Sequence, residues 1–434
     1  PMQFRPRSLA ALLPALLVPG ALFLASCSSE TGEDLDGLDE TANLPDELVN
    51  PNPPVAAAPL VFSEACAAGD RLTLSAVGDV LLHMPLQLQA KSTDKDASND
   101  DFGSLWSKSV PLFEKADISY ANFEGPADES KAPSSYPAFN YNPTLMQALL
   151  KASIDVVSSA NNHSLDKGSA GVVATLANFK KFGLPYTGTS EGGDVASHDW
   201  STVIERRTAS GKTMKVAYLA CSYASNSIAG ATNGIPDSKK QVLNCGRDRD
   251  FIMTTIGTLA KANDAVVVTP HWGVEYELKA RPEQKELAQA FIDAGALVVF
   301  GNHPHVPQPW EKVVSKKDGH EGFVLYSLGN FVSNQVEGVS SSTATWKSTV
   351  MYVGLTKKAD GKTVVNGARY TPIYMQKTPI RTALPAESAA AGASGKATVS
   401  FTQTMYHAQN MTKADAPTVE TAASLVNGVL TACK

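Results

Sequence analysis

Short apolar segments alternate with helical patterns between residues 70 and 330, and this alternation constrains the fold more than any other feature of the chain. The expected strands lie at 72–77, 117–121, 154–159, 215–220, 265–269 and 297–300. The expected helices lie near 143–152, 168–182, 248–262 and 281–294. Because strands that alternate with helices form largely parallel sheets covered by those helices, the pattern predicts an α/β fold.

The pattern changes after about residue 320, where strands and turns replace the alternation. Strands are expected at 323–326, 349–353 and 364–374, followed by a helix near 415–431. Hydrophobic residues make up 43% of the 434-residue chain and charged residues 18%, which excludes an overall disordered, collagen-like or coiled-coil protein. The net charge of −6 and the lack of a basic stripe interleaved with aromatic residues argue against nucleic acid as a partner.

The first 26 residues have the features of a secretory signal peptide. Arg5 and Arg7 precede an apolar run, Leu9 to Leu24, which is too short and too interrupted by proline to span a membrane. Its end, Leu24-Ala25-Ser26-Cys27, resembles the lipobox of bacterial lipoproteins, in which the cysteine is acylated. The alternative is an ordinary signal peptide with a chance cysteine. We expect Cys27 to be lipidated and the protein to be anchored to a membrane in the cell envelope, facing the periplasm or the exterior.

Residues 27–65 are expected to act as a tether between this anchor and a folded domain. Eight acidic residues lie between positions 30 and 47, four prolines follow between 51 and 59, and no Lys or Arg occurs among them. Such a segment cannot bury enough apolar surface to order itself. We expect a folded domain over residues 66–380 and a C-terminal extension, 381–434, that packs back on it.

Four further cysteines are compatible with disulfide bonds in an exported chain. Cys66 and Cys433 lie at the two ends of the expected folded part, and Cys221 and Cys245 flank a polar excursion rich in Ser, Asn and Gly. Four cysteines allow three connectivities. The simplest of these pairs Cys66 with Cys433 and Cys221 with Cys245.

Polar side chains follow five of the expected strands, at the point where each strand ends. They include five of the eight histidines of the chain, together with two Asp and two Glu residues: Asp79, His83, Glu124, Asn162, His163, Asp166, His271, Glu275, His303 and His305. Because the carboxyl ends of neighbouring parallel strands meet at one crevice, these loops should converge. Oxygen and nitrogen donors that converge in this way indicate a binuclear site for divalent metal ions, which could activate water and bind an oxyanion.

Each of these residues taken alone has a simpler explanation. Asp79 in a Gly-Asp sequence is typical of a turn, and Asn162 is a common turn former. Pro304 between His303 and His305 would by itself explain a sharp bend. The metal hypothesis therefore depends on the five loops together.

Six motifs in order carry a resemblance to a known family. They are Gly78-Asp79, Asn122-x-Glu124-Gly125, Asn161-Asn162-His163-Ser164-Leu165-Asp166, His271-Trp272-Gly273-x-Glu275-Tyr276, Gly301-x-His303-Pro304-His305-Val306 and Ser327-Leu328-Gly329-Asn330-Phe331. Over about residues 72–335 the chain resembles the capsule synthesis protein CapA family, which is tied to poly-γ-glutamate production. The resemblance implies a fold like that of the calcineurin-like metallophosphoesterases, an α+β sandwich of two β-sheets flanked by helices with a metal site at one edge.

The resemblance also implies roles for individual residues. Metal ligands would be Asp79, Glu124, Asn162, His271, His303 and His305, with Glu124 in the place of a bridging Asp, and His163 would be the catalytic acid. They would hold one or two divalent ions of the manganese, iron or zinc type. Leu81 departs from the phosphoesterase pattern, which has His there; His83, two residues on, could substitute. Glu275 is left as a metal ligand, a hydrogen-bond partner of a ligand histidine or a substrate contact.

Two classes of function remain open at this stage. The first is a metal-dependent hydrolase or transferase acting on the capsule polymer or on a phosphorylated precursor. The second is a non-catalytic component that binds or exports the anionic polymer. Expected partners are therefore an anionic polymer or a phosphorylated small molecule, the membrane through the lipid anchor, and membrane-bound capsule synthesis proteins. Likeness of fold alone cannot choose between the two classes.

Overall fold

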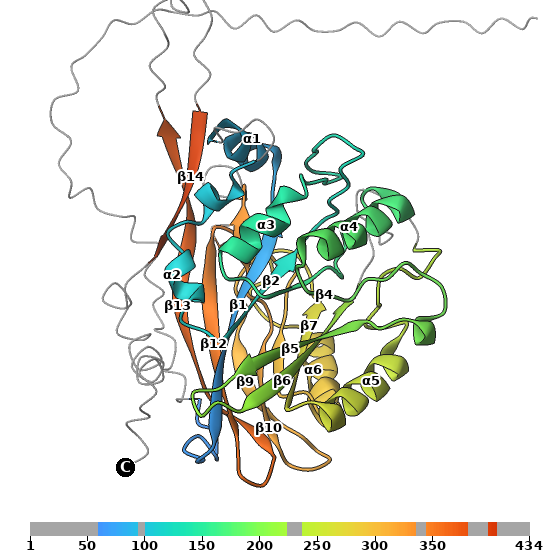
Figure 1. The fold of residues 1–434 in the computed structure, drawn as a ribbon, viewed down its shortest axis with the longest axis vertical. Helices are drawn as coiled ribbons and strands as arrows, with labels where there is room; N and C mark the ends of the chain where they lie inside the picture. The colour runs from blue at the N-terminus through green and yellow to red at the C-terminus, as the bar shows by residue number, and fades with distance from the viewer. Residues whose placement is uncertain (1–59, 94–99, 224–236, 336–343, 381–397, 406–434) are drawn as a thin grey trace, which may run out of the picture. The chain divides into compact units, whose positions relative to one another are not determined.

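The computed structural model describes residues 60–93, 100–223, 237–335, 344–380 and 398–405, and these residues form two β-sheets with helices (Figure 1). The first sheet has the strand order β14-β13-β12-β1-β2-β3-β4, and β11 also pairs with β1. Its strands are β1 (Asp70–Leu81), β2 (Ile118–Phe123), β3 (Val156–Ser158), β4 (Tyr186–Thr187), β11 (Asn330–Ser333), β12 (Lys347–Lys357), β13 (Thr363–Ile380) and β14 (Thr398–Met405). Strands β1 to β4 run parallel, whereas β12, β13 and β14 pair antiparallel.

The second sheet has the order β5-β6-β7-β8-β10-β9. Its strands are β5 (Ser201–Arg207), β6 (Thr213–Ser222), β7 (Ala265–His271), β8 (Val298–Phe300), β9 (Trp310–Val314) and β10 (Glu321–Leu325). Strands β6, β7, β8 and β10 are parallel, and β5 and β9 are antiparallel to their neighbours. Both sheets are therefore mixed.

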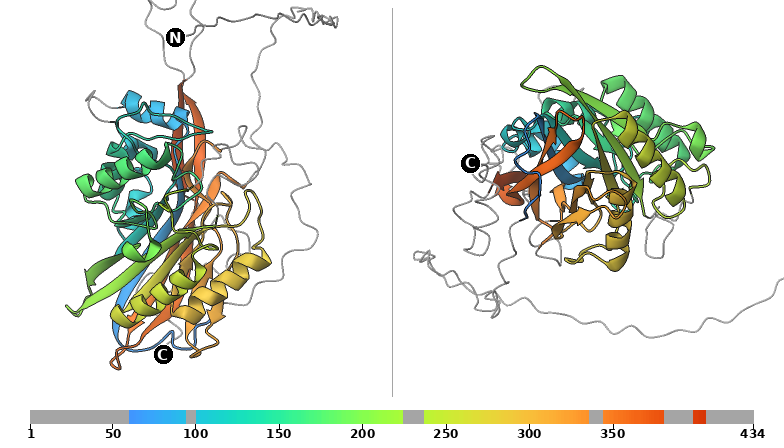
Figure 2. Two further views of the ribbon diagram at one scale, coloured as in Figure 1. Left: turned by 90° about the vertical axis from the view of Figure 1, so that its right-hand side faces the viewer. Right: turned by 90° about the horizontal axis from the view of Figure 1, so that it is seen from below.

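The helices cover the outer faces of the two sheets, so that the described residues form layers of helix, sheet, sheet and helix (Figure 2). Elements α1 (Met84–Thr93), η2 (Phe102–Leu105), α2 (Val110–Phe113), α3 (Thr144–Lys151) and α4 (Gly168–Phe182) contribute to the cluster on the first sheet. Helices α5 (Arg249–Ala262) and α6 (Pro282–Ala294) pack on the second sheet. A short 3₁₀ turn, η3 (Val195–Ser197), lies before β5.

Alternation along the strands explains why both faces of each sheet are apolar. In β7, Val267 packs between the sheets whereas Val266 and Val268 pack under α5 and α6. In β2, Tyr120 faces the second sheet and Phe123 faces α4. Strands that are buried on both faces read in the sequence as continuous apolar runs, which is the pattern that predicted them.

The structure confirms the expected α/β class and two sheets flanked by helices. Several elements lie outside the expected set, among them α1, α2, β4, β5, β9 and β11. The expected helix near 415–431 lies outside the described residues, and so do the proposed signal peptide and most of the tether. No helix in the described part of the chain is both long and apolar enough to cross a bilayer. The expected domain limits stay a prediction.

Candidate metal centre

The inward-facing positions at the carboxyl ends of β1, β2, β3 and β7 bring polar side chains together between the two sheets. Inward-facing Tyr120 is followed two residues later by Asn122, and inward-facing Val267 is followed four residues later by His271. A register shift in the pairing of β1 with β2, between Ala76 and Asp79, accompanies the placement of Asp79 beside Asn122. The site therefore draws on both sheets rather than on the edge of one.

Asn122 links the two buried carboxylates of the site. Its Nδ2 donates to Oδ1 of Asp79 at 2.8 Å and lies 3.3 Å from Oε2 of Glu124. Its own Oδ1 accepts a hydrogen bond from Oγ of Ser158 at 2.7 Å, which fixes the orientation of the amide. Asn122 is the first residue of the Asn-x-Glu motif, and no role was predicted for it; its place in that motif was the available signal.

Three of the other predicted ligand side chains meet around His271. Its Nε2 lies 2.9 Å from Oδ1 of Asn162, 3.1 Å from Nδ1 of His303 and 3.7 Å from Oε1 of Glu124. The ring centroids of His271 and His303 are 4.8 Å apart. The amide and imidazole donors of three separate loops therefore point toward one small volume beside Glu124.

His305 connects this group to Asp79. Its Nδ1 lies 3.0 Å from Oδ2 of Asp79 and 3.0 Å from Oδ1 of Asn330, and its Nε2 lies 3.9 Å from Oε1 of Glu124. His303 and His305 both have positive φ angles, 99° and 58°, which non-glycine residues seldom adopt. Asn330, which begins β11, is a second residue to which sequence reasoning assigned no role.

His163 lies at the periphery of this group and is held by a carboxylate. Its Nδ1 is 2.8 Å from Oδ2 of Asp166, which also accepts a hydrogen bond from the backbone amide of Phe139 at 2.7 Å. The Phe139 ring meets the His163 ring edge-on at a centroid distance of 4.8 Å. The ring of His163 is therefore fixed, with Nε2 left for a further partner.

The residues present fit a divalent metal. Oε1 of Glu124 is fully buried and has no hydrogen-bond partner among the residues that the structure describes, although buried polar atoms nearly always have one. In the described part of the chain, two groups of three side chains have donor atoms within 4.8 Å of one another: Asp79, Glu124 and His305, and Glu275, His303 and His305. Mixed carboxylate and imidazole donors suit zinc, manganese or iron.

Burial and the neighbouring charges set the protonation of the metal-free site. Burial, and then the charge of Asp79, raises the pKa of Glu124 well above its usual range. Burial and the nearby His303 lower the pKa of His271 well below its usual value, and burial and His305 lower the pKa of His303 to about 3. Burial also opposes the charged form of His305, but Glu124 and Asp79 outweigh it and raise the pKa of His305 to about 10.

Leu81 and His83 lie apart from the two groups of donor atoms. The side chain of Leu81 belongs to the apolar cluster between the first sheet and its helices. The ring of His83 contacts the Leu81 carbonyl, 3.2 Å from Nδ1, and the edge of Phe139. Burial lowers the pKa of His83 to about 4. Neither residue supplies an atom to the groups that could hold a metal.

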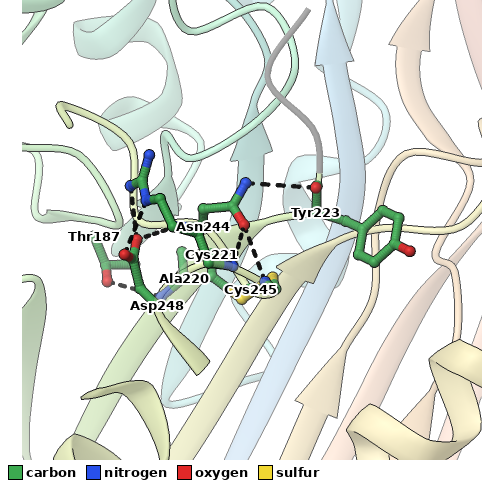
Figure 3. The surroundings of a disulfide bond; sticks show 9 residues. Thr187, Ala220, Cys221, Tyr223, Asn244, Cys245 and Asp248 are labelled. Atoms are coloured by element: carbon green, nitrogen blue, oxygen red, sulfur yellow. Dashed lines mark hydrogen bonds and ion pairs between the residues drawn. A yellow bond between two sulfur atoms is a disulfide. The ribbon is translucent and has the colours of Figure 1, made fainter. Parts of the chain in front are cut away.

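A disulfide bond joins Cys221 and Cys245 beside the end of β7 (Figure 3). Both residues are buried. The Tyr223 amide, which follows β6, donates to the carbonyl of His271 at 2.7 Å, and the Cys245 amide donates to the carbonyl of Ser222 at 3.0 Å. The bond therefore ties residues 242–245 to the strand end next to His271. Cys433 lies outside the described residues, so its pairing with Cys66 stays a prediction.

Comparison with known proteins identifies relatives over the same part of the chain. Residues 73–335 match the family described as bacterial capsule synthesis protein PGA_cap. The chain is 31% identical over 278 residues to the capsule biosynthesis protein CapA of Bacillus anthracis, a match that covers 61% of this chain and 61% of that protein. It is 28% identical over 319 residues to the PGA biosynthesis protein CapA of Bacillus subtilis, covering 72% and 76%. Among solved structures, the calcineurin-like phosphoesterase YfkN of Bacillus subtilis is similar with a TM-score of 0.43 and 15% identity, over 70% of this chain and 91% of that one.

Proposed function

Because the chain belongs to the bacterial capsule synthesis protein family PGA_cap, we propose that it acts in the biosynthesis of a poly-γ-glutamate capsule through a divalent-metal centre. The centre would serve a metal-dependent hydrolase or transferase acting on the polymer or on a phosphorylated precursor. Two named relatives, from Bacillus anthracis and Bacillus subtilis, are capsule or PGA biosynthesis proteins, which supports the process but not the reaction.

The buried, unpartnered Oε1 of Glu124 carries the proposal. It lies 3.7 Å from Nε2 of His271 and 3.9 Å from Nε2 of His305, with Asp79 on the other side of His305. A carboxylate oxygen in such a place costs free energy unless a cation or a proton satisfies it. Asp79, Glu124, Asn162, His271, His303 and His305 would hold the metal, which when bound supplies a Lewis acid and an activated water.

His163 would provide the proton that the leaving group needs. Asp166 and the edge of Phe139 fix the His163 ring, so its Nε2 can present a proton to a bound substrate without a search over rotamers. The side chain is 5% exposed, which limits its contact with bulk water. The fixed ring supports general acid catalysis at this position.

A second candidate is a polymer-binding or export component, and the place of Leu81 favours it. The side chain that would be histidine in the phosphoesterase pattern is packed in the apolar core, so one metal position would lack a nitrogen ligand. In that case the metal would hold anionic polymer without cleaving it. The proposed location is the same for both candidates: the cell envelope, anchored to the membrane through Cys27.

Three variants of the full chain separate the two candidates. His271→Ala should lose bound metal, measured by elemental analysis of purified protein, because it removes a central nitrogen donor. His163→Ala should retain metal but lower hydrolysis of the polymer or of a phosphate ester by about 10²–10⁴-fold. His320→Ala is the matched control, since that ring pairs with Asp318 away from the centre. Full capsule formation by His163→Ala together with none by His271→Ala would reject catalysis and favour binding.

A further inference from the structure

Glu275 brings a third carboxylate to the metal centre from a different loop. It lies in the segment between β7 and α6, and its carboxylate is within 4.8 Å of donor atoms of His303 and His305. Asp79 and Glu124 are fully buried, whereas Glu275 is exposed. The donors therefore form an inner group around Asp79 and Glu124 and an outer, solvent-facing group around Glu275 and His303.

Backbone and side-chain hydrogen bonds hold the Glu275 segment against the His303 segment. The Trp272 amide donates to the Asn302 carbonyl at 3.0 Å, and the Tyr276 amide donates to the Pro304 carbonyl at 2.8 Å. Two residues beyond Glu275, the Glu277 carbonyl accepts a hydrogen bond from Nε2 of Gln308 at 2.7 Å. Because anchors lie on both sides of Glu275, its carboxylate is kept near the two histidines and is not free to swing away with a mobile loop.

The charge balance of the centre favours two divalent ions. Among the residues that the structure describes, no lysine or arginine forms an ion pair with Asp79, Glu124 or Glu275; Asp79 and Glu124 pair only with histidines. Once metal binding has displaced their protons, the three carboxylates and the neutral imidazoles would carry a charge of −3. One divalent ion leaves an uncompensated negative charge at a site that must accept an anion, whereas two leave a positive one.

We propose that Glu275 is a metal ligand, which together with His303 binds a second, outer divalent ion next to the inner ion of Asp79, Glu124 and His305. Glu275 would thus supply a donor at a centre that lacks the histidine whose place is taken by Leu81. This inference rests on the proposed function, since it requires a metal centre. An outer ion that faces solvent is the one that an anionic substrate would meet first.

The test counts Mn²⁺ ions bound to the full-length protein. Equilibrium dialysis with elemental analysis should give two Mn²⁺ per chain, and electron paramagnetic resonance should show coupling between them. The Glu275→Gln variant should bind the inner Mn²⁺ with unchanged affinity and lose the coupling between the two ions. The His303→Ala variant should lose the same outer Mn²⁺. In both variants the affinity for the outer ion should fall at least about 100-fold. Loss of a residue that merely supports a metal ligand already lowers metal affinity about 10–100-fold.

Controls keep the outcomes distinct. Glu283→Gln, which neutralises an exposed carboxylate at the start of α6, should retain both ions. Asp79→Asn should weaken the inner ion instead of the outer one. Two ions bound with unchanged affinity by Glu275→Gln would overturn the assignment while leaving the metal centre intact. Absence of Mn²⁺, Zn²⁺ and Fe²⁺ binding by the wild-type protein would overturn the proposed function as well.

Discussion

Metal binding should displace a proton from His305, and the affinity should therefore depend on pH well above the usual range of histidine. In the metal-free site, Glu124 and Asp79 overcome the effect of burial and raise the pKa of His305 to about 10. His303 has a pKa lowered to about 3, and the pKa of His271 is also lowered, so these two rings are already neutral at pH 7. A metal bound near Asp79 must therefore displace at least the proton on His305, and the raised pKa of Glu124 adds to this competition.

The magnitude follows from the number of protons released. One proton displaced gives a tenfold change in affinity per pH unit, or about 1.4 kcal/mol. Between pH 6 and pH 9 the affinity should rise at least about 1,000-fold, because the pKa of His305 lies above this whole window and one displaced proton gives tenfold per pH unit. Histidines with ordinary pKa values near 6.5 would instead give an affinity that levels off above about pH 7.5.

The assay is a competition between the protein and a chelating dye for Zn²⁺ or Mn²⁺ at pH 6, 7, 8 and 9, corrected for the protonation of the dye. A parallel titration in weak buffer at pH 8 should release at least about one proton per inner ion. His163→Ala should show the same slope, because His163 is outside the two groups of donor atoms. An affinity that is flat between pH 7.5 and 9 would refute the reasoning that His305 holds the competing proton.

Two further predictions concern the covalent features of the chain. Replacing both Cys221 and Cys245 by Ala should lower the free energy of unfolding by about 3–4 kcal/mol, the chain-entropy value for their sequence separation of 24, measured by urea denaturation; an unchanged midpoint would contradict a stabilising role. If the proposed lipid anchor at Cys27 exists, Cys27→Ala should move the protein from the detergent phase to the aqueous phase and remove the lipid from the mass of the mature N-terminus. Unaltered membrane partitioning of that variant would reject the lipoprotein hypothesis.

Local features of the sequence were sufficient to predict the elements that are apolar on both faces. The runs at 215–220, 265–269 and 297–300 lie in β6, β7 and β8, and the helices expected near 168–182 and 248–262 are α4 and α5 within a residue or so. Helix α1 was not anticipated, since Met84–Thr93 contains the alternating run Leu86-Gln87-Leu88-Gln89, which resembles a strand more than an amphipathic helix. Its tertiary contacts decide its conformation.

The residues of the candidate site were also predicted in part. Loops that follow parallel strands must converge, and the resemblance to the CapA family selected six residues of these loops as ligands. The structure brings them together: Asp79, Glu124, Asn162, His271, His303 and His305. Asn122 and Asn330 lie in two of the six motifs but were assigned no role, because an asparagine at a strand end is also typical of a turn. Only the register of β1 against β2, which pairs Asp79 with Asn122, shows that the Asn122 amide spans two carboxylates.

The sequence by itself determined the α/β class, the order of the strands along the chain and the residue types that end each strand, since periodicity and turn chemistry are local properties. The tertiary structure alone decided which strands belong to each of the two sheets, that Leu81 enters the core, and that Glu275 faces His303 and His305 across two loops. The same structure sets the pKa values of the centre. These properties depend on distances between residues far apart in the chain and on the exclusion of water. The local pattern of residues specifies neither of them.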